Sequence, residues 1–129
     1  MTSPGAKPLD AGTRLAVDRT RLAYERTLMA WVRTATSLIS FGFTIYKFFQ
    51  LELKGPGAQA EPLIGARGFA LIMIATGLLA LALSTFEHRR SLQAMREEFG
   101  PIPPSTATIV AALISVLGIL ALVAVAVRR

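Results

Sequence analysis

Three long apolar blocks separated by polar segments form the main pattern of this chain. Residues 27–46 carry one charge, that of Arg33, while residues 68–86 and residues 99–127 carry none. About 20 helical residues cross the roughly 30 Å hydrocarbon core of a bilayer, so each block predicts one membrane-spanning helix. The third block is the most apolar, and it begins after the helix-stopping sequence PIPP. We expect an all-α fold, because no stretch alternates as a strand would.

The polar segments predict the domain organisation. The opening MTSPGAKPLDAGT is rich in Pro, Gly and small residues, and we expect residues 1–13 to form a disordered N-terminal tail. Residues 14–129 should form one domain, an integral membrane three-helix bundle with a long, amphipathic first helix. Its helices are predicted at about residues 14–50, 66–96 and 105–128, with Gly and Pro in both connections.

Composition and charge support a membrane protein and weigh against other classes. The 129 residues are 53% hydrophobic, yet 14 basic residues against 8 acidic ones give a net charge of +6. This charge lies at the edges of the apolar blocks and not on polar helices, so nucleic acid is not an expected partner. The chain has no cysteine, and its one histidine, His88, is expected at the membrane interface. We therefore expect no metal, no cofactor and no enzyme activity.

The distribution of basic residues predicts the orientation. Eight lie in the N-terminal segment and second loop, and five lie on the opposite side of the predicted membrane. Basic residues concentrate on the cytoplasmic side, which favours a cytoplasmic N-terminus and an outer C-terminus in the plasma (inner) membrane.

A seven-residue repeat of polar positions runs along the first helix. Its members are Arg19, Arg26, Arg33, Ser40 and Lys47, with Ser37 and Thr44 beside them. Seven residues come to nearly two helical turns, so these side chains should share one face. None of the three arginines has an acidic residue three or four positions away, whereas Arg21 has both Asp18 and Glu25. Arg89 is similarly unpaired, because Glu87 is better placed for Arg90.

These unpaired cations must meet lipid phosphate, water, another chain or a bound anion. Three helices cannot enclose a wide pore, so a path lined by the repeat requires several copies in a ring. The first hypothesis is a homo-oligomeric anion conduit or channel, with pore-lining Arg19, Arg26, Arg33 and Arg89 supported by Ser37, Ser40, Thr44 and Lys47. The alternative is a structural or assembly subunit that binds anionic membrane lipid or an acidic partner, without transport.

The sequence AYERTLMAWVR resembles the signature of the YidH-like family of small three-helix membrane proteins, catalogued as domain-of-unknown-function family 202. The residues that carry the resemblance, which extends over roughly residues 14–127, are Glu25, Arg26, Thr27 and Trp31.

The same region is similar to the membrane part of the vacuolar transporter chaperone complex. That similarity implies a five-membered ring around a polyphosphate path, with Arg19, Arg26 and Arg89 at basic positions. Arg33 often aligns with an uncharged residue there, and these 129 residues do not include the polyphosphate-synthesising or regulatory domains of that complex.

Overall fold

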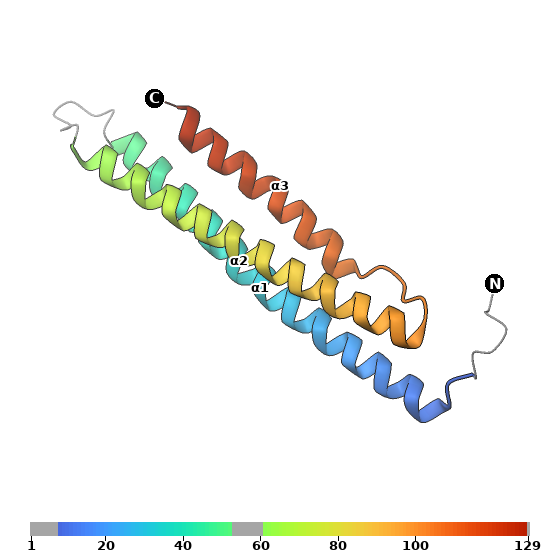
Figure 1. Ribbon diagram of the computed structural model, residues 1–129. Coiled ribbons are helices and arrows are strands. Elements are labelled where there is room, and N and C mark those ends of the chain that lie inside the picture. The colour runs from blue at the N-terminus through green and yellow to red at the C-terminus, as the bar shows by residue number, and fades with distance from the viewer. Residues whose placement is uncertain (1–7, 53–60, 129) are drawn as a thin grey trace.

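The computed structural model of the chain describes residues 8–52 and 61–128, which form three helices and no strand (Figure 1). Helix α1 spans Ala11–Glu52, α2 spans Glu61–Phe99 and α3 spans Thr106–Val127. Helices α1 and α2 lie antiparallel, and α3 packs against both. All three are long and apolar enough to cross a membrane. The predicted all-α bundle of three membrane-spanning helices is confirmed.

The N-terminal end of α1 differs from the sequence prediction. Ala11, Gly12 and Thr13 were assigned to the disordered tail but are helical, while residues 1–7 of that tail lie outside the described residues. Asp10 explains the earlier start, because its carboxylate accepts a hydrogen bond from the Thr13 hydroxyl and its carbonyl accepts one from the Arg14 N–H, 3.1 Å away. The hydrogen bond from Thr13 also lowers the pKa of Asp10.

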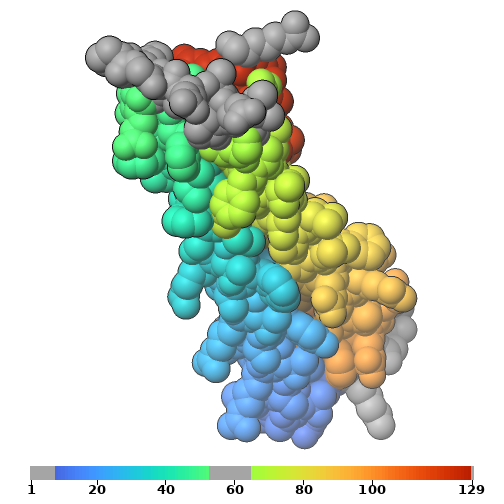
Figure 2. All heavy atoms as spheres, turned by 90° about the vertical axis from the view of Figure 1, so that its left-hand side faces the viewer, coloured from blue at the N-terminus to red at the C-terminus, as the bar shows by residue number. Residues whose placement is uncertain are grey.

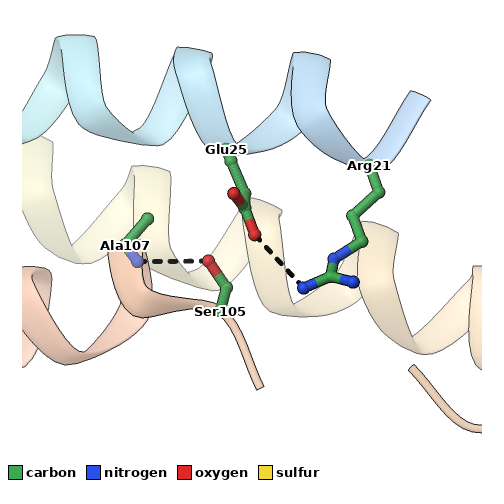
Figure 3. Close-up of polar contacts among 4 residues, drawn as sticks. All are labelled: Arg21, Glu25, Ser105 and Ala107. Atoms are coloured by element: carbon green, nitrogen blue, oxygen red, sulfur yellow. Dashed lines mark hydrogen bonds and ion pairs between the residues drawn. The ribbon is translucent and has the colours of Figure 1, made fainter. Parts of the chain in front are cut away.

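The link between α2 and α3 is fixed by a cap at each end. Gly100 ends α2 in a left-handed conformation with φ of 95°, and its N–H donates to the Arg96 carbonyl at 3.0 Å. Ser105 then caps α3, because its hydroxyl accepts a hydrogen bond from the Ala107 N–H at 3.2 Å (Figure 3). At the other end of α3, the Arg67 guanidinium donates to the Ala126 carbonyl at 2.5 Å.

Two glycines allow α1 and α2 to approach closely. A Cβ atom added to Gly77 of α2 would lie 3.1 Å from the Ala35 carbonyl oxygen of α1. A Cβ atom added to Gly42 of α1 would likewise lie 3.1 Å from the Ala70 carbonyl oxygen of α2. Such contacts are typical of helices that associate within lipid, where small residues let backbones meet.

Two apolar clusters define the layer in which all three helices overlap. One cluster joins Leu28 of α1 to Leu81 and Ala107, and the other joins Tyr46 of α1 to Ile74 and Val125. Helix α3 therefore extends from the level of Leu28 to that of Tyr46, about 27 Å at 1.5 Å per residue. This length matches a bilayer core, and the start of α1 and the end of α2 project beyond it as an antiparallel pair of helices (Figure 1).

We expect Gly77→Ala to destabilise the bundle by about 1–3 kcal/mol, because the new methyl group would press on the Ala35 carbonyl and force α1 and α2 apart. Thermal unfolding of the purified protein in mild detergent measures the loss. Gly68→Ala is the matched control, since a Cβ atom there has no neighbour within 4 Å. Equal stability of the two variants would contradict the close contact.

Candidate anion-binding surface

The predicted polar repeat lies on the free face of α1. We call Arg19, Arg26 and Arg33 the arginine stripe. All three are exposed, whereas the side of α1 that faces the bundle carries the buried residues Leu28, Val32, Ala35, Ile39, Gly42 and Tyr46. In Figure 2, α2 lies along one side of α1, and no helix covers the other side of α1 on the viewed face. Within one protomer, the stripe therefore points away from the helices that pack against α1.

The stripe arginines have no acidic partner among the described residues. The ion pair in this part of the chain joins Arg21 to Glu25 at 3.5 Å, as the four-residue spacing predicted (Figure 3). This pair uses the carboxylate that directly precedes Arg26 in the sequence. No side-chain hydrogen bond or ion pair of Arg19, Arg26 or Arg33 is formed within residues 8–52 and 65–128. Their guanidinium donors are open to water, lipid, another chain or an anion.

The stripe crosses the edge of the three-helix layer. Arg26 lies next to the level of Leu28, where α3 begins, and Arg19 lies about 10 Å further out. Arg33 lies about 8 Å inside that level, on helix surface that hydrocarbon would cover if the protomer were alone in a bilayer. Placing an arginine at the centre of a lipid-facing helix costs about 2.5–3.5 kcal/mol, less near the edge. Because of this cost, the position of Arg33 favours a hydrated environment for its guanidinium over hydrocarbon.

The predicted supporting residues are mostly engaged within α1 itself. The Ser37 hydroxyl donates to the Arg33 carbonyl at 3.0 Å, and the Thr44 hydroxyl donates to the Ser40 carbonyl at 2.7 Å. Lys47 donates to the Gln50 side chain at 3.4 Å, and its ammonium lies 5.8 Å from the centre of the Phe43 ring. Ser40 is exposed. The arginines are thus the main uncommitted donors on this face.

Arg89 lies on a different surface. It is exposed in a groove between α2 and α3, where Thr108 lines the same cavities. Neither of these two cavities is lined by a residue of the stripe. The four arginines proposed from the sequence therefore do not converge within one protomer.

The residues of the family signature occupy ordinary helical positions near the layer edge. Glu25 is held by Arg21, and the Thr27 hydroxyl donates to the Ala23 carbonyl at 3.1 Å. Trp31 is 45% exposed, as expected for an aromatic residue near the membrane interface. Only Arg26 among them presents an unpaired charge.

His88, which the sequence places at the membrane interface, is buried against the neighbouring helix at the level of Tyr24. Its side chain is 4% exposed between α1 and α2, beside a cavity of about 130 Å³ that Tyr24 and Ser84 also line. Neither ring nitrogen has a hydrogen-bond partner in the described part of the chain. The sequence carried a signal for this burial, since Gly77, Leu81, Ser84 and His88 follow the four-three-four spacing of one helix face. The described residues hold no group of three metal-ligating side chains.

The fold and the distribution of charge define a multi-pass membrane protein with three helices. The family described as Domain of unknown function (DUF202) matches residues 19–94, more than half of the chain, and the protein belongs to this family. The match includes the arginine stripe and Arg89 but ends before α3, short of the range 14–127 expected from the resemblance. No curated protein and no solved structure matches the chain.

We expect the free face of α1 to be wet at mid-depth, because the Arg33 guanidinium draws water along it. The chain has no native cysteine, so Ser40→Cys introduces a single reactive thiol. A charged, membrane-impermeant thiosulfonate should modify this thiol in liposomes. Ile119→Cys is the control, since it lies at the same depth on α3 and Ile119 is 52% exposed. Equal modification of both positions, or of neither, would contradict a hydrated face on α1.

Proposed function

We propose that this protein is a passive anion conduit formed by several copies arranged in a ring, with α1 of each copy toward the shared centre. The observation that supports the proposal most strongly is the arginine stripe. It combines exposure, the lack of an acidic partner within the described residues, and a position at Arg33 inside the layer that α3 spans. A ring would give these guanidinium groups a hydrated surrounding in place of hydrocarbon.

Electrostatics relates such a ring to anions. Each copy would bring three unneutralised positive charges toward the centre, and their mutual repulsion would destabilise an empty ring. Bound anions relieve that repulsion. The arginines are spaced about 10 Å apart along the helix axis. An extended polyanion such as polyphosphate would contact arginines at several depths at once. A small inorganic anion would move from the arginines at one depth to those at the next. The proposed pentamer and the polyphosphate-like ligand rest on the resemblance to the vacuolar transporter chaperone complex and to YidH-like proteins.

The proposed setting is the plasma (inner) membrane, with the N-terminus in the cytoplasm. The antiparallel helix ends that project beyond α3 carry Arg14, Arg19 and Arg21 on α1 and Arg90 and Arg96 on α2. A cytoplasmic location of this basic end agrees with the preference of positively charged segments for that side. The proposal requires no catalytic group, and we propose no enzyme activity.

We expect the purified protein in liposomes to pass iodide, measured by quenching of an enclosed fluorophore. The double variant Arg26→Gln/Arg33→Gln should reduce this flux at least tenfold, because it removes the attracting charges at the entrance and inside the layer. The control Arg14→Gln/Arg90→Gln removes the same formal charge outside the stripe and should conduct normally. Absence of flux in the unaltered protein, or unchanged flux in the stripe variant, would refute the conduit.

A structural or assembly subunit is the second candidate function. It is favoured by the position of the stripe on the outside of a single protomer, where arginines reach lipid headgroups by extending toward the interface. This candidate requires no ring and no flux. A monomer in bilayers that binds anionic lipid or an acidic protein without conducting would support it over the conduit.

A further inference from the structure

Two cavities meet along the groove between α2 and α3. The first has a volume of about 620 Å³, and its polar lining consists of Arg89, Gln93, Arg96, Glu97, Ser105 and Thr108. The second has a volume of about 330 Å³, and its lining includes Ala82, Thr85, Phe86, Ala111, Ala112 and Ser115. Arg89 and Thr108 line both cavities. The groove therefore has a polar part and a largely apolar part that share these two residues.

The polar part is suited to an anion. Arg89, Gln93 and Arg96 are spaced four and three residues apart, so they share one face of α2. Neither arginine forms an ion pair within the described residues, and the single carboxylate in the lining, Glu97, leaves a net positive charge. The first turn of α3 borders the same cavity and adds the positive end of its helix dipole. Arginine recognises phosphate well, because its planar fork donates two parallel hydrogen bonds.

The second part of the groove lies at a different depth. Thr108 is next to Ala107, which belongs to the cluster at the edge of the three-helix layer. From Thr108 to Ser115 the lining extends about 10 Å into that layer. Alanine side chains on both helices keep this stretch open. The polar cavity is thus at the height of lipid headgroups, and the apolar cavity is at the height of acyl chains.

We propose that this groove binds one anionic phospholipid per chain, with its phosphate between Arg89 and Arg96 and one acyl chain along Ala82, Ala112 and Ser115. A free phosphate ion would satisfy the arginines and leave the apolar cavity empty. A neutral partner would fill the apolar cavity and leave two cations without a counter-charge. A phospholipid with a net negative headgroup matches both parts at once. The inference involves α2 and α3 and does not rest on transport through the stripe.

The test is native mass spectrometry of the full chain, purified in mild detergent with phosphatidylglycerol or phosphatidylcholine added. The unaltered protein should retain phosphatidylglycerol at least tenfold more than phosphatidylcholine. Arg89→Gln/Arg96→Gln should reduce that retention at least tenfold. Arg90→Gln is the matched control, because Arg90 is exposed beside Arg89 and lines neither cavity. Equal retention of both lipids, or an equal loss in the control, would overturn the proposal.

A second set of measurements separates the lipid from other occupants. Ala112→Phe places a ring in the apolar cavity from an exposed position and should also reduce phosphatidylglycerol retention. Inorganic phosphate and deacylated glycerophosphoglycerol should fail to displace the lipid. Displacement by either would identify a free-anion site, and a dimer that forms without lipid through this groove would identify a second copy as the occupant. Each of these results would overturn the proposal.

The two proposals can fail separately. The stripe variant Arg26→Gln/Arg33→Gln should retain phosphatidylglycerol like the unaltered protein, because its substitutions lie outside the groove. Loss of lipid in that variant would assign lipid binding to α1 and overturn the groove, whether or not the protein conducts. Absence of iodide flux together with intact, Arg89- and Arg96-dependent lipid retention would refute the conduit and leave the groove.

Discussion

The close approach of α1 and α2 determines which side of α1 faces outward. Gly77 meets the backbone of α1 at Ala35, and Gly42 meets the backbone of α2 at Ala70. Lipid tails are as apolar as leucine, so the hydrophobic effect gives these helices little reason to associate, and close packing becomes decisive. The contact fixes the rotation of α1 about its axis. The arginine stripe is exposed because it lies outside the face of the same helix that packs against the bundle.

The unbalanced charge of that face follows from local chemistry. Glu25 is next to Arg26 in sequence, but adjacent residues on a helix do not face each other, and the carboxylate instead meets Arg21 one turn earlier. Further along, the hydroxyls of Ser37 and Thr44 donate to their own backbone. The face therefore enters the membrane layer with positive charge and little within its own helix to balance it. Any environment that stabilises Arg33 must come from outside the protomer.

The sequence predicted the number and type of elements because apolar blocks longer than a bilayer core leave little alternative to helices. It also predicted the Arg21–Glu25 pair, since that contact depends only on spacing within one helix. It did not predict that Arg89 and the stripe lie on different surfaces. That separation depends on the rotation of α2 against α1, which Gly42 and Gly77 determine through contacts distant in sequence. The burial of His88 was missed for the same reason, although its spacing from Gly77 and Leu81 indicated it.

Because Arg89 is separate from the stripe, its positive charge does not require a pore shared between copies. A phospholipid in the α2–α3 groove would supply Arg89 and Arg96 with a counter-charge from the bilayer itself. No other copy of the protein would be needed for this. The cavities beside Arg21 and beside Tyr24, which are lined in part by α1, include none of Arg19, Arg26 and Arg33. The case for a ring therefore rests on three arginines of one helix and not on four from two helices. Of these three, Arg33 supports a ring most strongly, because it lies deepest in the layer and its side chain is furthest from a lipid headgroup.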